Sequence, residues 1–184
     1  MKTTCRGAVL AAAPLLVAAP LLIGAASPAD PAAPTTDATC VMNGHGIFAT
    51  AVDPGGIGLP AGNTLAMTGT VECVDSAGAA TATGVFERTV TMPAAECTGD
   101  EHGDTSVTTV HWADKTTSTF RFDHTDVVKV NGTASLVVTG AVTPDSTRFA
   151  GDTVNAVGTS TGVGCGTPAG ETALDSTLVL RLTH

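Results

Sequence analysis

The chain has 184 residues, with 17 Asp and Glu against 8 Lys and Arg, and its formal net charge is −9. This length supports one domain with a core of its own. An acidic chain without a basic cluster is repelled by phosphate backbones and by anionic lipid surfaces, so the composition argues against nucleic acid as a partner. Aromatic residues make up only 3% of the chain, which disfavours a sugar-stacking aromatic surface.

The first residues have the order of a secretory leader. Lys2 and Arg6 give a positive start, an apolar stretch follows, and small residues precede a cut expected after Ala26 or Ala29. The apolar stretch is short and interrupted by proline, which does not suit a membrane span. We therefore expect residues 1–29 to be a signal peptide and the protein to be secreted, extracellular or associated with the cell wall.

The expected mature chain begins with a flexible lead-in at 30–39, followed by a single β-domain at 40–184. Removing Lys2 and Arg6, the only charged residues of the leader, changes the net charge from −9 to −11. No second apolar segment follows, so we expect no membrane span in the mature chain.

Short β-branched segments alternate along the mature chain with clusters of Gly, Asp, Asn and Pro. This pattern predicts an all-β fold of about eight antiparallel strands in a meander, forming a barrel or a sandwich. The expected strands lie near 40–52, 63–74, 83–92, 105–113, 117–130, 134–143, 152–163 and 173–183.

Alternation within these strands predicts their inward faces. In the last strand, Leu178, Leu180 and Leu182 share one face. In the strand at 117–130, strict alternation places four apolar residues together on one face, namely Phe120, Phe122, Val128 and Val130.

The Asn131-Gly132 turn bears on this assignment. A two-residue turn would set Val128 opposite Ser135, pairing an apolar face with a polar one. A three-residue loop would set Val128 opposite Leu136 instead, so we expect a bulged hairpin with Gly132 in the left-handed conformation.

Four cysteines remain after the leader, and an even count in an exported chain predicts two disulfides. Their spacing contains no C-x-x-C pair, which disfavours zinc. The residues are Cys40, Cys73, Cys97 and Cys165. In a simple meander the first two lie at one end of the sheet and the last two at the other, which favours Cys40–Cys73 and Cys97–Cys165 over the two alternative connectivities.

Three short motifs, CVMNGHGIF at 40–48, TGTVEC at 68–73 and FAGDTV at 149–154, stand before the late Cys165 and a final alternating strand. With these features the chain resembles small secreted actinobacterial β-proteins of unknown function. The resemblance spans nearly all of 40–184. It implies an extracellular β-fold and assigns no catalytic residues.

One candidate site combines Arg88, His124 and Asp126, which alternation places on inward faces. Asp126 would then compensate the charge of an inward Arg88, and the three would line a polar ligand pocket inside a barrel. The alternative is a bulge at 123–126 that turns His124 and Asp126 to water.

The acidic loop at 96–104 is a second candidate, because several carboxylates on a Gly-containing loop can hold Ca²⁺. The candidate ligands are Glu96, Asp100, Glu101 and Asp104. Their spacing does not fit an EF-hand, and acidic loops are usually just solvated. We expect no other cofactor.

These observations favour a secreted, non-catalytic β-domain that binds an extracellular or cell-wall partner or contributes to the cell envelope. The first alternative is a small-ligand-binding barrel with an interior pocket. The second is a secreted hydrolase whose acid/base pair lies among Asp123, His124, Asp126 and Asp152, although no G-x-S-x-G motif is present.

Overall fold

The computed structural model describes residues 35–55 and 61–184. Contacts divide the chain into two units, Met1–Ala32 and Ala33–His184. The expected signal peptide at 1–29 lies outside the described residues, which all belong to the second unit. Its first strand begins at Thr36, within the segment expected to be a flexible lead-in.

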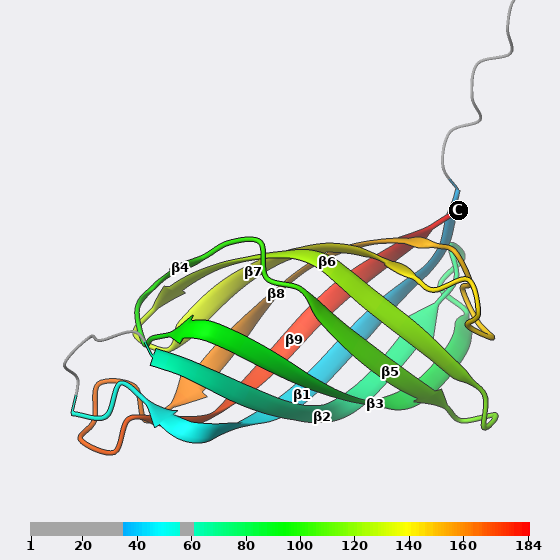
Figure 1. The fold of residues 1–184 in the computed structure, drawn as a ribbon. Helices are drawn as coiled ribbons and strands as arrows, with labels where there is room; N and C mark the ends of the chain where they lie inside the picture. Colours follow the sequence, from blue (N-terminus) through cyan, green and yellow to red (C-terminus); the bar gives the residue numbers. More distant parts are fainter. Residues whose placement is uncertain (1–34, 56–60) are drawn as a thin grey trace, which may run out of the picture. The chain divides into compact units, whose positions relative to one another are not determined.

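The described residues of this unit form nine strands, and the eight expected ones are all present (Figure 1). The ninth, β4, is a short strand inside the acidic loop. The strands are β1 (Thr36–Val52), β2 (Ala61–Val74), β3 (Ala80–Ala95), β4 (Gly99–Glu101), β5 (Ser106–Trp112), β6 (Thr117–Val130), β7 (Thr133–Val142), β8 (Thr153–Val163) and β9 (Glu171–Thr183).

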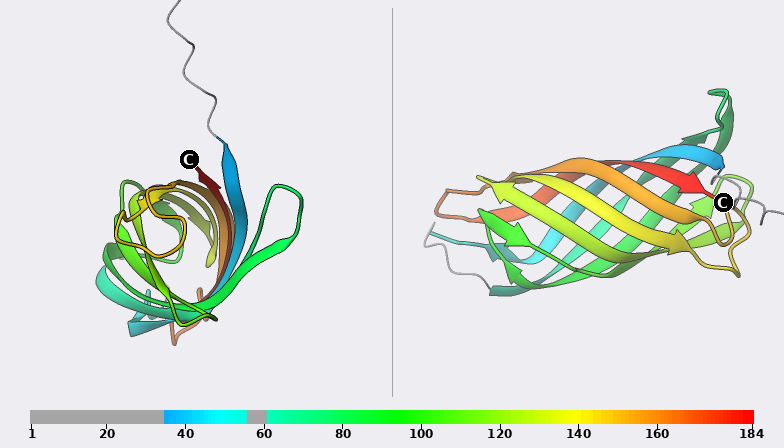
Figure 2. Two further views of the ribbon diagram at one scale, coloured as in Figure 1. Left: turned by 90° about the vertical axis from the view of Figure 1, so that its right-hand side faces the viewer. Right: turned by 90° about the horizontal axis from the view of Figure 1, so that it is seen from above.

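The strands form one antiparallel sheet in the order β4-β6-β5-β3-β2-β1-β9-β8-β7. An additional pairing of β6 with β7 closes eight of them into a barrel, and β4 is the extra strand beside β6. The closed ring is visible along its axis in the left view of Figure 2. The prediction of an all-β meander is therefore confirmed, and the barrel is the form it takes.

Alternate side chains of each strand point into the barrel. Leu178, Leu180 and Leu182 of β9 all point inward and are buried, as expected. At the end of the barrel where β5 turns into β6, Trp112 packs edge-on against Phe149 and its indole N–H donates to Ser118 Oγ at 2.9 Å. The indole N–H, the polar group of this aromatic pair, is therefore hydrogen-bonded.

The β6–β7 hairpin does not have the expected three-residue loop. Val130 pairs directly with Thr133, so the loop is a two-residue turn. Asn131 and Gly132 both have positive φ, at 53° and 77°, as a type I′ turn requires.

The register shift lies instead within β6, between Phe122 and His124, where Asp123 is a β-bulge. The bulge reverses the alternation, so Val127 pairs with the half-buried Leu136 and Val128 is exposed. The expected common face of Phe120, Phe122, Val128 and Val130 is therefore wrong for its last two members. The apolar residues of β6 and β7 therefore lie on the same face of the sheet, as expected. The bulge at Asp123 sets this register, and not a three-residue turn.

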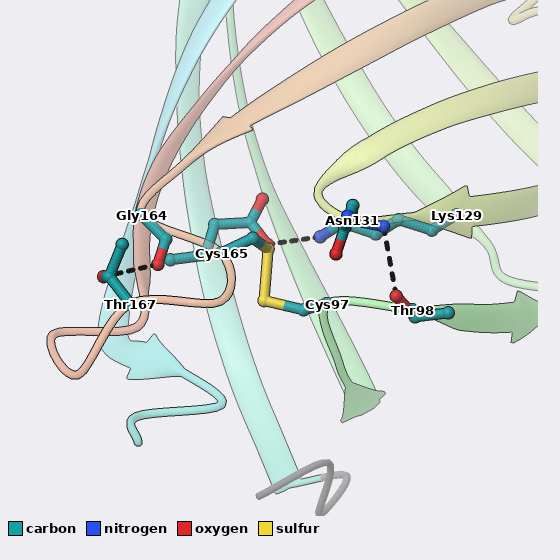
Figure 3. Close-up of a disulfide and its surroundings, with 8 residues drawn as sticks. Cys97, Thr98, Lys129, Asn131, Gly164, Cys165 and Thr167 are labelled. Carbon is teal, nitrogen blue, oxygen red and sulfur yellow. Dashed lines mark hydrogen bonds and ion pairs between the residues drawn. A yellow bond between two sulfur atoms is a disulfide. The ribbon is translucent and has the colours of Figure 1, made fainter. Parts of the chain in front are cut away.

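Both disulfides have the expected connectivity. Cys40 and Cys73 lie directly opposite each other on β1 and β2, and both are buried. Cys97 follows β3 and bonds to Cys165 in the loop after β8, at the same barrel end as the Asn131-Gly132 turn (Figure 3). In the described part of the chain, no helix is long and apolar enough to cross a membrane.

Candidate functional site

The barrel wall lacks hydrogen bonding at one place. Pairing of β3 with β5 stops at Arg88 opposite Thr108, and beyond that point β3 pairs only with β2 among the described strands. At the same level of the barrel, β6 pairs with β4 and no longer with β5. A lateral gap between β3 and β4 follows from this arrangement.

An interior cavity of about 80 Å³ reaches this gap. Its border at the gap is formed by β3 on one side and by the chain from β4 to β5 on the other. Its deeper wall is mainly apolar and comes from β2, β6, β7, β8 and β9. The residues around it are Leu65, Met67, Arg88, Val90, Met92, Glu101, Asp104, Thr105, Ser106, Thr125, Val127, Lys129, Ala134, Leu136, Ser160, Leu174, Ser176 and Leu178.

Arg88 is the cation of this cavity that lacks a carboxylate partner. Among the described residues, no carboxylate oxygen lies within 4.0 Å of its guanidinium nitrogens. Its Nε is buried without a hydrogen bond to any described residue, and its Cζ lies 5.9 Å from the ring centre of Phe122. Burial lowers the pKa of the Arg88 guanidinium to about 10, as expected for a cation that is poorly compensated.

Lys129 also lines the cavity, but its charge is neutralised. Its Nζ lies 2.5 Å from Glu171 Oε2, and the two side chains are 10% and 0% exposed. Burial raises the pKa of Glu171, and the positive charge and hydrogen bond of Lys129 oppose that rise. The same Glu171 oxygen lies 2.9 Å from Cys165 Sγ, so the ion pair packs directly against the Cys97–Cys165 disulfide.

Glu101 and Asp104 form an acidic pair at the gap. Burial raises the pKa of Glu101 to about 7, and the hydrogen bond and negative charge of Asp104 add to the effect, while Lys129 opposes it. Near neutral pH, therefore, the charge of the cavity changes with the protonation of Glu101.

The free energy of unfolding is expected to fall as the pH rises from about 4.5 to about 7. Folded Glu101 holds its proton more tightly than the unfolded chain does, so its contribution is complete below pH 4.5 and lost through pH 7. Burial raises the pKa of Asp152 and Glu171 too, so these groups act in the same direction. Urea unfolding followed by the fluorescence of Trp112, the single tryptophan, measures the slope.

Glu101→Gln is expected to flatten this pH dependence, because the amide stays neutral and can still donate to Asp104. Glu72→Gln is the matched control, since Glu72 lies exposed on the outer face of β2. An unchanged slope in Glu101→Gln would show that Glu101 does not hold a proton in the folded barrel.

The structure does not bring Arg88 together with His124 and Asp126. The bulge at Asp123 turns both to the outer face, where His124 is half exposed. There Asp126 Oδ1 lies 3.0 Å from His124 Nε2 and 2.9 Å from His102 Nδ1. These hydrogen bonds, that of His102 first, lower the pKa of Asp126. The expectation that Asp126 compensates Arg88 is thus wrong, and the bulged alternative is what the structure has.

The four candidate calcium ligands are divided by the alternation of β4. Asp100 pairs with the outward Val128 and is exposed, whereas Glu101 faces the cavity with Asp104. Glu96 is close enough for its charge to raise the pKa of Glu101. Among the described residues, Glu96, Asp100, Glu101 and Asp104 contribute to none of the groups of three side chains placed to share a metal ion.

Of the residues named for a hydrolytic acid/base pair, Asp123, His124 and Asp126 lie together on the outer face of β6, and Asp152 lies elsewhere. Asp123 pairs with Arg121 at 2.7 Å on the outer face, close to the His124–Asp126 pair. Asp152 lies just before β8, where it contacts His184 at 3.2 Å.

Lys129 and Glu171 were not anticipated. Strict alternation from Phe120 places Lys129 outside, and only the bulge at Asp123 turns it inward. The Asn131-Gly132 turn could have predicted the inward Lys129. Its usual two-residue form sets Val127 opposite the inward Leu136, and this register directs Lys129 inward as well. Glu171 lies before the expected start of the last strand, and no sequence pattern marked it as buried.

Fold and site together define a closed antiparallel barrel with an interior cavity that is lined in part by residues on both sides of the gap between β3 and β4. Comparison with protein-family models, with curated proteins and with solved structures finds no match to this chain. The resemblance to small secreted actinobacterial β-proteins stays a prediction.

Proposed function

We propose that this protein is a non-catalytic binding protein whose barrel holds a small amphipathic organic anion. The observation that carries the proposal is Arg88, a partly buried cation whose Nε is buried without a partner and which has no described carboxylate partner, beside a cavity whose deeper wall is mainly apolar. A charge withdrawn from water without a counterion is costly, and an anionic ligand would relieve that cost. Eight-stranded barrels are wide enough to hold one small ligand.

The size of the cavity limits the ligand. At roughly 10–15 Å³ for each water-sized group, a cavity of about 80 Å³ has room for on the order of six non-hydrogen atoms. A short aliphatic chain would lie against Leu178, Leu136 and Val127, with its carboxylate at Arg88. A longer tail would leave through the gap between β3 and β4.

Glu101 makes the proposed binding dependent on pH. Above pH 7 the Glu101–Asp104 pair carries one more negative charge beside the cavity, which disfavours an anion. We expect affinity for an anionic ligand to fall as the pH rises through about 7.

We also propose that the protein works outside the cytoplasm. Its two disulfides support this, because such bonds persist in oxidising compartments. The partner would then be an extracellular or cell-wall compound, and the expected signal peptide at 1–29 would direct the chain there.

Titration of the full chain with butyrate, butyramide and butylammonium tests the proposal, with amide chemical shifts as the readout. Butyrate is expected to bind with a Kd of roughly 1 mM, about −4 kcal/mol, and to shift residues around the cavity. Butyramide and butylammonium should bind at least about tenfold more weakly, because neither offers Arg88 a negative charge. Equal affinity for all three, or preference for the cation, would contradict an anion site.

A further inference from the structure

Three strands place metal-ligating side chains together at the barrel end opposite the Cys97–Cys165 disulfide. In the sheet, β9 lies between β1 and β8. The residue after β9 is His184, and its backbone exchanges two hydrogen bonds with Thr35, of 3.1 and 3.0 Å. Asp152 stands immediately before β8. The pairings of Thr183 with Thr36 and with Thr153 bring these segments into register.

Asp37 joins this group through a local irregularity. The register of β1 against β9 shifts between Thr36 and Ala38, so Asp37 is the unpaired residue of a β-bulge. One ligand atom each from Asp37, Asp152 and His184 lies within 4.8 Å of the others. Asp152 Oδ1 is 3.2 Å from His184 Nδ1.

The buried member of the group, Asp152, is incompletely satisfied. Its side chain is 1% exposed, and its second oxygen, Oδ2, has no hydrogen-bond partner among the described residues. No Lys or Arg of the described chain lies within 4.0 Å of either carboxylate. The nearby Arg181 donates to Thr36 Oγ1 instead. Two adjacent carboxylates, one of them buried, therefore lack a permanent cation.

We propose that Asp37, Asp152 and His184 bind a divalent transition-metal ion, with Zn²⁺ as the best match. Imidazole and carboxylate oxygens are zinc ligands, whereas Ca²⁺ prefers oxygen ligands alone. Three protein ligands leave a position for water. Bonds of about 2.0–2.2 Å require the ligand atoms to approach more closely, and the exposed side chains of Asp37 and His184 have the freedom to do so. The ion would join β1, β8 and β9, and the site is independent of the interior cavity.

Calorimetric titration of the full chain with ZnCl₂ tests this site. The background carries Cys5→Ser, His102→Gln and His124→Gln, which removes the thiol outside the described residues and the imidazole pair around Asp126. One Zn²⁺ is expected to bind in the micromolar range and to raise the unfolding temperature. His184→Gln and Asp37→Asn, both at exposed positions, should each weaken binding by about tenfold or more.

His45→Gln is the matched control, because His45 is an exposed histidine beside a single carboxylate, Asp175, at 2.8 Å. It should leave Zn²⁺ binding unchanged. Absence of Zn²⁺ binding, or binding that His184→Gln does not weaken, would overturn the site. Ca²⁺ bound as tightly as Zn²⁺, and equally well by His184→Gln, would overturn the role of the imidazole.

Discussion

Lys129→Met is expected to lower the free energy of unfolding by about 3–5 kcal/mol at a pH near 8, because it leaves a buried carboxylate without its cation. Glu171 is 0% exposed, and its Oε1 already has no hydrogen-bond partner among the described residues. Urea unfolding followed by Trp112 fluorescence provides the measurement. The loss should shrink as the pH falls, because burial raises the pKa of Glu171 and the carboxyl group then takes up a proton in place of the ammonium.

Two controls separate this effect from a general loss of packing. Lys129→Met combined with Glu171→Gln removes both charges and should be less destabilised than the sum of the single changes. Arg121→Met breaks the ion pair with Asp123 on the outer face and should cost no more than about 1 kcal/mol. If Lys129→Met cost as little as Arg121→Met, the buried pair would not hold this end of the barrel together.

Removing the Cys97–Cys165 disulfide is expected to cost about 4 kcal/mol on the loop-entropy model. The bond closes a loop with a sequence separation of 68 residues. It also ties the β3–β4 connection to the Gly164–Gly170 loop beside the buried Glu171. The variant Cys97→Ala with Cys165→Ala, unfolded in urea, gives the cost directly.

The second disulfide serves as the comparison. Cys40–Cys73 has a sequence separation of 33, so the same relation predicts a loss smaller by about half a kcal/mol. Its sulfurs lie in the barrel core, and their removal adds a packing loss. A cost below about 1 kcal/mol for Cys97→Ala with Cys165→Ala would contradict a structural role for that bond.

The strands and the disulfide pairing could be predicted from the sequence because both depend on short-range signals. Turn residues separate the strands, and alternation marks the inward leucines of β9. The cysteine pairing then followed from which end of a meander each cysteine occupies. β4 was not expected, since three residues that pair only with β6 carry too little pattern to mark a strand.

The candidate site could be predicted only in part, because it depends on one bulge. Strict alternation correctly directs Arg88 inward, but the extra residue at Asp123 exchanges the two faces of β6. His124 and Asp126 therefore lie outside and Lys129 inside. The alternative of a bulge at 123–126 came from the polar pair that strict alternation placed inward, and the turn at Asn131-Gly132 was a second signal for the same register.

The central claim is that Arg88 recognises an anion inside the barrel, and one titration tests it most directly. Butyrate is added to the wild-type chain, to Arg88→Met and to Arg121→Met, which makes the same exchange on the outer face of β6. We predict that butyrate shifts the amide signals of Arg88, Val127 and Leu178 in the wild type and in Arg121→Met. In Arg88→Met its affinity should fall by at least about tenfold. Equal affinity in all three proteins, or shifts confined to the outer face, would contradict the claim.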